Sequence, residues 1–420
     1  MTEPSATATV LAAPAPATPA LMTRSWVVLL LALLLGLQPV TTDLYLPALP
    51  SLTEGFGASM PQAQLTLTAL LLAFGLSQLV WGPLSDRWGR RPVLLWGMGA
   101  YVLASMGCAL APSIELLILW RTLQGVAMGA AVMAARAVVR DLYPPVEGAR
   151  VMSQALTGLG IIACTCAPMG GLLTDQWGWR PALMVLAVFG LMTWALLALR
   201  YKETLAQPNP HALEPVALAR AWWVIVNNPT FRAYCALSSI SYLGLFSFLA
   251  TSSFVFVRQF GLSKTHYGFL MLSMSLSYIV GTFICRWLLR RMSVQNCVKL
   301  ASCFTLTGGL SLTLLAYAGQ GEAWYGPWAV MVPVYVFMLA HGVHQPCGQS
   351  GAVAPFPQMA GTASALNGFL MMLGAFFVGS WLGTHMAEPV FALAHGMLLC
   401  SLCIGLVAWT WVRRLPTLSA

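Results

Sequence analysis

The chain has 420 residues, of which 58% are hydrophobic and only 8% are charged, and its mean hydropathy is +0.76. A soluble domain carries about 25% charged residues, so this composition excludes a water-facing protein, including a soluble nucleic-acid binder, in spite of the net charge of +9. The solvent that suits such a chain is lipid.

Apolar runs long enough to span a bilayer recur along the chain, since each spanning helix needs roughly 20 apolar residues. Six runs precede a polar stretch and six follow it: 26–47, 62–82, 92–111, 117–139, 151–173, 179–199, then 232–257, 266–288, 297–318, 327–347, 360–384 and 389–411. This pattern predicts an all-α membrane protein with twelve transmembrane helices in two six-helix halves.

The polar stretches define the expected domains. Residues 1–24 are rich in Ala, Pro and Thr, and a disordered cytoplasmic tail is expected there. The expected order is then a six-helix bundle over 25–200, a cytoplasmic central linker over 201–229, a second six-helix bundle over 230–412 and a cytoplasmic tail over 413–420.

The positive charges are distributed unevenly between the two ends of the predicted helices. With the N-terminus inside, most of the 21 Lys and Arg residues fall in inner segments. The outer loops contain only Arg180, Arg258 and Lys264. This asymmetry follows the positive-inside rule and predicts that both termini are cytoplasmic.

The first apolar run ends in TTDLYLPALP (Thr41–Pro50) and contains Asp43, whereas the other acids of the chain lie in loops, tails or helix ends. A charged carboxylate in a membrane costs roughly 3 kcal/mol, and burial favours its neutral form. Asp43 is therefore suited to bind and release a proton, or else it is a solvated residue at the outer helix end. Pro47 and Pro50 should bend or end this helix and leave carbonyl groups free.

Two arginines lie inside predicted helices. Arg121 cannot lose its proton, so it needs a partner or a wet cavity, and Gln124 shares its helix face. Arg121 acts either on Asp43 and the substrate or as an anchor for nearby backbone carbonyls. For Arg136 the favoured interpretation is a side chain that extends to the cytoplasm.

His341 and His344 are three residues apart on one helix face. They either titrate near physiological pH or face the cytosol, and the sequence leaves their role open. The ten cysteines lie in or beside apolar runs without zinc-site spacing, so neither a disulfide nor a metal or other cofactor is expected. The sequence contains no nucleotide-binding loop or nucleophile elbow, which argues against an enzyme.

The segment WGPLSDRWGRRPVLL (Trp81–Leu95) resembles the loop motif of the major facilitator superfamily, G-x-L-a-D-r-x-G-r-R. RTLQGVAMGA (Arg121–Ala130) resembles the fourth-helix motif of its proton-coupled drug exporters. TTDLYLPALP, RDLYP (Arg140–Pro144) and FPQMAGTASAL (Phe356–Leu366) are similar to its Bcr/CflA drug-resistance branch. The resemblance covers nearly the whole chain after the N-terminal tail.

In helix 151–173, Gly160, Pro168 and Gly171 fit the family's antiporter motif. Ala167 and Leu172 stand where glycine is commoner. The small residues still allow close helix approach.

The resemblance implies a monomeric drug:proton antiporter of the bacterial inner membrane. Such a protein exports small amphipathic drugs, such as bicyclomycin- or chloramphenicol-type compounds, by alternating access. The alternative is a proton-coupled exporter of a metabolite, an amino acid or a sugar, in the same fold. Its partners are the drug, protons and the lipid bilayer.

The resemblance also assigns roles to individual residues. Proton coupling falls to Asp43 and Arg121, and the substrate cavity to Gln38, Tyr45 and Gln124. A conformational switch falls to the loop residues Gly82, Asp86, Arg87, Gly89, Arg90 and Arg91 together with Asp141. Asp86, Arg90 and Asp141 should form a charge cluster, and Asp86 should also meet the positive N-terminal end of the eleventh helix.

Overall fold

The computed structural model describes residues 22–415 apart from 211, 320 and 323. The described residues include twelve helices that are long and apolar enough to cross a membrane, and they contain no strand. The predicted fold class is confirmed. Most of the expected N-terminal tail and residues 416–420 lie outside the described residues.

The first half contains six spanning segments. They comprise α1 (Arg24–Thr42) with the 3₁₀ turn η1 (Leu46–Ala48) and α2 (Leu49–Phe56), α3 (Met60–Trp88), α4 (Arg90–Leu110), α5 (Ile114–Leu142), α6 (Pro145–Trp177) and α7 (Trp179–Arg200). The proline-rich end of the first run thus bends one long segment, Arg24–Phe56, in place of ending it.

The second half repeats this number of segments. They comprise α9 (Pro229–Ser253) with the π-helical turn η2 (Phe254–Gln259), α10 (Lys264–Leu289), α11 (Val294–Ala318), α12 (Pro327–Val353), η3 (Pro357–Met359) with α13 (Ala360–Thr384), and α14 (Pro389–Leu406) with the turns η4 (Val407–Trp411) and η5 (Val412–Arg414).

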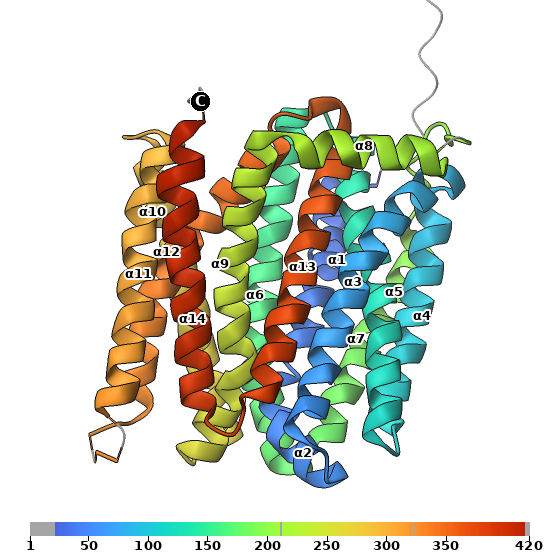
Figure 1. Cartoon of the computed structure of the whole chain (residues 1–420). Helices are drawn as coiled ribbons and strands as arrows, with labels where there is room; N and C mark the ends of the chain where they lie inside the picture. Colours follow the sequence, from blue (N-terminus) through green and yellow to red (C-terminus); the bar gives the residue numbers. More distant parts are fainter. Residues whose placement is uncertain (1–21, 211, 320, 323, 416–420) are drawn as a thin grey trace, which may run out of the picture.

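The connection between the halves contains a helix that the apolar pattern does not predict. Helix α8 (Pro215–Asn227) runs across one end of the bundle and packs against α9 and α13 (Figure 1). We call this end the linker end. The opposite end, which carries α2, is called the α2 end.

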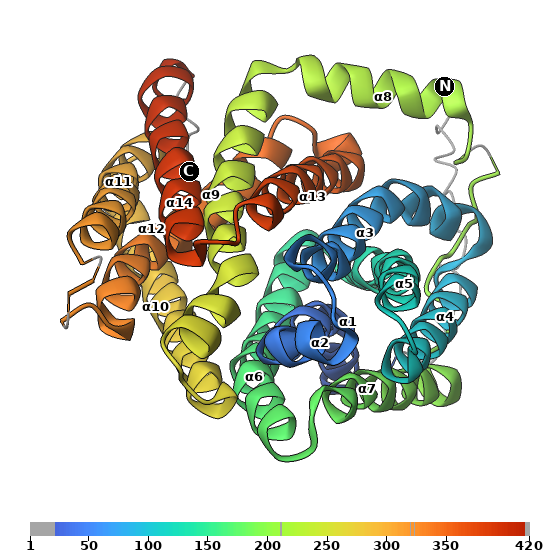
Figure 2. The ribbon, with the colours of Figure 1, turned by 60° about the horizontal axis from the view of Figure 1, so that its bottom comes forward.

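The two halves meet along two main helix pairs, α3 with α13 and α6 with α10 (Figure 2). Glycines allow the second pair to approach closely. A Cβ atom at Gly171 would collide with the backbone of Lys264, and one at Gly268 would collide with the backbone of Ala167. This is the close packing through small residues that is common between membrane helices.

The contact between α6 and α10 is made near the α2 end. Gly160, which lies on α6 about three turns nearer the linker end, has no atom within 4 Å of the position that a Cβ would take. The halves are therefore packed together at the α2 end of this helix pair, and α6 has free space beside it toward the linker end.

Two glycine substitutions test the packing. A Cβ at Gly125 on α5 would collide with the backbone oxygen of Leu70 on α3, so we expect Gly125→Ala to destabilise the protein by about 1–3 kcal/mol. Gly160→Ala meets no atom and should be neutral or slightly stabilising, since alanine favours a helix. Thermal unfolding of both purified variants measures the difference. Equal melting temperatures would contradict the packing described.

Candidate functional site

Asp43 is the first residue after α1, at the bend of the first spanning segment. Its backbone N–H donates to the carbonyl oxygen of Pro39 at 2.8 Å, and its carboxylate accepts a hydrogen bond of 2.8 Å from the Thr42 hydroxyl. The side chain is half-buried. A carboxylate with one hydroxyl donor is weakly satisfied, so little holds it in its charged form.

Asp43 faces the boundary between the two halves. The turn η1, which begins three residues after it, packs against α6 of the first half and against α9 and α10 of the second. The bend that carries Asp43 is therefore in contact with the second half.

A small cavity of about 10 Å³ is lined by Thr42, the residue that precedes Asp43. Both halves contribute to its walls, which are formed by Thr42, Leu46, Leu67, Leu71, Tyr242, Phe246 and Leu249. This volume is close to the minimum that holds one water molecule.

Arg121 of α5 is fully buried, and its guanidinium binds backbone oxygens. Both terminal nitrogens donate to the carbonyl oxygen of Thr41 at 3.1 Å, and Nε donates to that of Thr66 at 3.4 Å. The guanidinium carbon lies 4.2 Å from the centre of the Tyr45 ring. Among the described residues, no ion pair joins Arg121 to Asp43. The geometry thus matches the anchoring role.

The predicted cavity residues Tyr45 and Gln124 belong to the same buried network. Gln124 accepts from Arg121 at 2.8 Å and donates to the Ser105 hydroxyl at 2.7 Å, and the Tyr45 hydroxyl is 2.6 Å from that of Thr66. Both side chains are fully buried. Gln38 is half-buried, so of the three it is the one with exposed surface.

The loop motif forms a charge cluster at the linker end. Arg90 contacts Asp86 at 2.6 Å and Asp141 at 2.8 Å, while Arg140 lies 3.7 Å from Asp86. The structure thus brings together the three residues expected to cluster, and adds Arg140. Both of these partners of Asp86 belong to its own half.

The rest of the loop motif is held by the end of α7. Arg91 donates to the carbonyl oxygens of Tyr201 at 2.8 Å and Ala198 at 3.2 Å, whereas the Arg87 side chain is exposed. A Cβ atom placed at Gly82 would lie 3.6 Å from the Met133 side chain, which is an ordinary van der Waals contact.

Glu203, at the start of the linker, caps the N-terminus of α4 at the linker end, a contact that the sequence analysis does not predict. Its carboxylate accepts hydrogen bonds of 2.9 Å from the backbone N–H groups of Arg90 and Arg91, the first residues of α4. Gly89 has a φ of +99° and leaves the space that the carboxylate occupies. The available signal was an acid soon after a spanning helix, and helix N-termini need acceptors.

A second acid joins the two halves at the α2 end. Asp175, near the end of α6, accepts hydrogen bonds from the backbone N–H groups of Lys264 at 3.3 Å and Thr265 at 2.8 Å, and from the Thr265 hydroxyl at 2.7 Å. The Lys264 ammonium lies 3.8 Å from the same carboxylate. An acid of the first half thus caps the N-terminus of α10 in the second.

Arg136 also connects the halves, but toward the linker end. Its guanidinium donates a hydrogen bond of 2.9 Å to the Ser364 hydroxyl on α13. The favoured interpretation, a side chain extended to the cytoplasm, missed this contact because the sequence does not show that α13 faces α5.

The two histidines of α12 lie in the interior, so the cytosol-facing alternative is wrong. His341 is 3% exposed and His344 is 0% exposed. His341 Nδ1 lies 2.8 Å from the Ser241 hydroxyl on α9, and its ring packs on Tyr278 with a centroid distance of 5.4 Å.

A family model described as Major Facilitator Superfamily matches residues 31–379. The chain belongs to the major facilitator superfamily. The resemblance expected from the loop motif is confirmed, and the protein is a transporter of this superfamily.

Three curated members of comparable length are similar to the chain. Multidrug resistance protein D of Escherichia coli (strain K12) is 28% identical over 84% of this chain and 87% of its own length. A bicyclomycin resistance protein homolog of Haemophilus influenzae is 27% identical, over 88% and 91%. A chloramphenicol resistance protein of Pseudomonas aeruginosa is 27% identical, over 91% of both. These names support the resemblance to the drug-resistance branch.

Solved structures agree on the fold. A D-xylose-proton symporter superposes with a TM-score of 0.71 at 15% identity, over 93% of this chain and 98% of its own. A bacterial homolog of the lysosomal transporter Spinster, in an inward-facing and unoccupied conformation, gives 0.68 at 15% identity, over 93% and 96%. At this identity the likeness concerns the major facilitator fold alone and does not favour a sugar as substrate.

Arg121 can be tested as an anchor in this major facilitator protein. Arg121→Met leaves the Thr41 carbonyl without its charged donor, so we expect a loss of about 2–3 kcal/mol in unfolding free energy. Arg121→Lys should lose less, because it keeps one charged donor. Thermal unfolding in detergent measures both, with Arg220→Met on the exposed face of α8 as control. Parent-like stability of Arg121→Met would argue against anchoring.

Proposed function

We propose that this transporter is a proton-coupled multidrug exporter that moves small amphipathic drugs, of the bicyclomycin or chloramphenicol type, by alternating access in the bacterial inner membrane. The observation that carries the proposal is the position of Asp43. Among the described residues, every other carboxylate lies near the end of a spanning segment or between segments. Relatives named for drug resistance support the class of cargo.

The proposed coupling follows from the cost of charge in a membrane protein. Asp43 is charged when its surroundings are wet and favours its neutral form when the boundary between the halves closes over it. A proton bound on one side and released on the other then drives the return of the empty carrier. Arg121 keeps Asp43 in place by fixing the preceding carbonyl of Thr41, without forming an ion pair with it.

The linker end is the proposed cytoplasmic side, because it carries most of the cations. At this end are the loop arginines, Arg140 and the end of α7 with Arg200, whereas the α2 end has Arg180, Arg258 and Lys264. With an even number of spanning segments, the two termini lie on the same side, which is then the cytoplasm.

Two acids are proposed to act as opposed latches. Asp175 holds the N-terminus of α10 across the halves at the α2 end, while Asp86 pairs with Arg90 and Arg140 within the first half. This combination fits a state closed at the α2 end. In the opposite state we expect the Asp175 contacts to break and Asp86 to reach the N-terminus of α13.

Proton coupling through Asp43 can be measured in proteoliposomes that contain a trapped pH dye. With an imposed pH gradient, chloramphenicol or bicyclomycin should dissipate the gradient through the parent protein. Asp43→Asn should abolish this proton movement while drug counterflow without a gradient persists, because asparagine resembles the protonated acid but cannot release a proton.

Glu322→Gln, a change at an exposed loop carboxylate, is the matched control and should couple like the parent. If Asp43→Asn still couples, the carrier lies elsewhere, and His341 is the next candidate. If no drug moves protons in either protein, a metabolite becomes the better cargo.

The Asp175 latch can be tested through the populations of the two states. Asp175→Asn weakens a charge-assisted cap on α10 by about 1–2 kcal/mol, so the state open at the α2 end should gain roughly tenfold in population. Spin labels on the ends of α6 and α10, read by double electron–electron resonance, measure the opening. Glu388→Gln, at the same end but exposed, serves as control. An unchanged distance distribution in Asp175→Asn would refute the latch.

A further inference from the structure

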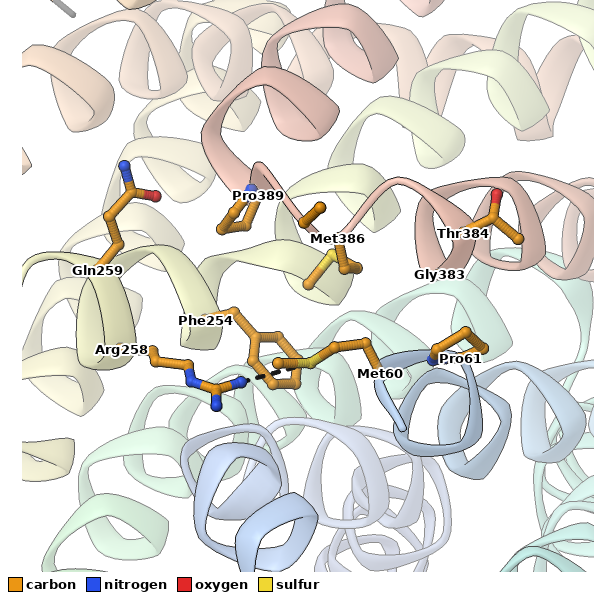
Figure 3. A pocket seen from close by; sticks show the side chains of 10 residues that line it. Met60, Pro61, Phe254, Arg258, Gln259, Gly383, Thr384, Met386 and Pro389 are labelled. Carbon is orange, nitrogen blue, oxygen red and sulfur yellow. Dashed lines mark hydrogen bonds between the residues drawn. The ribbon is translucent and has the colours of Figure 1, made fainter. Parts of the chain in front are cut away.

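A second, larger cavity lies at the α2 end, away from Asp43. Its volume is about 620 Å³ (Figure 3). The start of α3, in the first half, contributes one wall, and η2 with the α13–α14 connection, in the second half, contributes the others. We call this cavity the vestibule, and the side chains that matter below are Met60, Phe254, Arg258, Gln259, Thr384 and Met386.

The vestibule contains the one cation of this end that the described structure leaves without an oxygen partner. Arg180 donates to the carbonyl oxygen of Ala111 and stacks on Trp179, and Lys264 contacts Asp175. Arg258, in contrast, is exposed, and its guanidinium contacts the Met60 sulfur at 3.9 Å (Figure 3). A thioether is a weak acceptor, so the guanidinium donors remain available.

The local backbone presents Arg258 and Gln259 at the rim. They lie in η2, where the helix widens to π geometry: Phe260 N–H bonds to Val255 O at 3.0 Å. Single π-helical turns of this kind occur frequently at functional sites. Both residues line the vestibule, with the Arg258 guanidinium directed toward Met60 and the Gln259 amide directed away from it (Figure 3).

The chemistry of the walls defines the class of ligand. Phe254, Met60 and Met386 offer apolar surface, and methionine adapts to ligands of different shape. Arg258, Gln259 and Thr384 add a few polar groups, as in ordinary small-molecule sites of 300–1,000 Å³. Guanidinium binds carboxylate in a bidentate manner. Glu388 is exposed next to the lining residues Ala387 and Pro389, but it does not line the cavity.

We propose that the vestibule is a second ligand site, separate from the surroundings of Asp43, which binds amphipathic small molecules through a carboxylate or similar anionic group held by Arg258. The inference rests on the proposed export function, in which this end is the exit side. Compounds with an anionic group then pause here after leaving the centre, and cationic compounds do not.

The charge preference can be measured without transport. In a background lacking the more accessible thiols Cys164, Cys303 and Cys403, Thr384→Cys is labelled with anionic sulfonatoethyl or cationic trimethylammonioethyl methanethiosulfonate. The anionic-to-cationic rate ratio should fall about fivefold to tenfold when Arg258→Gln is added. Arg180→Gln removes the same charge at the same end and should change the ratio little. Equal ratios with and without Arg258 would overturn the proposal.

Ligand protection identifies the occupant. Nalidixate, an anionic amphipathic compound, should slow labelling of Thr384→Cys, whereas ethidium, a cation, should not, and Arg258→Gln should abolish the protection. A phospholipid phosphate has related chemistry, so dihexanoyl phosphatidylglycerol is tested in parallel. Protection by this lipid alone would overturn the proposal in favour of a lipid site.

The same measurement in Asp43→Asn separates the two hypotheses. Protection by nalidixate should persist there, because the vestibule does not involve Asp43. A protein that fails to couple protons but retains charge-selective protection would refute the proposed coupling and support the vestibule. The converse result would retain the coupling and refute the vestibule.

Discussion

A buried guanidinium fixes the point at which the first spanning segment bends. Helix ends leave carbonyl groups without helical partners, and in a membrane such groups must find other donors. Arg121 supplies two hydrogen bonds to the Thr41 oxygen and packs on Tyr45. Asp43 lies between Thr41 and Tyr45 in the chain, so its position at the boundary of the halves depends on the Arg121 side chain of α5.

The contacts that join the two halves differ between the two ends of the bundle, so one end is held together more strongly than the other. At the α2 end, Asp175 crosses from one half to the other. At the linker end, the cluster of Arg90, Asp86 and Asp141 lies within one half. There Arg136 crosses to Ser364 through a single hydrogen bond to a hydroxyl, without an opposite charge. A charged cap at one end and a weaker contact at the other favour separation at the linker end.

Hydropathy predicts the spanning segments well, because lipid requires an apolar run of roughly 20 residues in each of them. The contacts between halves were not predictable in this way. The pattern places Asp175 just beyond a predicted helix and favours a cytoplasmic direction for Arg136. Their contacts with Thr265 and Ser364 do not follow from it, since no spacing along the chain shows which helix faces which. For Arg121 the sequence leaves two roles open, action on Asp43 and anchoring of backbone carbonyls, and in the structure the guanidinium binds the Thr41 carbonyl oxygen. Helix α8 was missed because its apolar run is too short to span a bilayer.

The linker has little slack. Glu203 ties its start to α4, and the backbone N–H of Asn209 donates to the Asp86 carbonyl oxygen at 2.9 Å. Helix α8, which begins at Pro215, packs on α9 and α13 of the second half. The residues between 209 and 215 can extend only about 20 Å, so the linker acts as a short tether. In the proposed alternating-access cycle, this tether limits how far the halves separate, and its end in the first half is held at the backbone of Asp86.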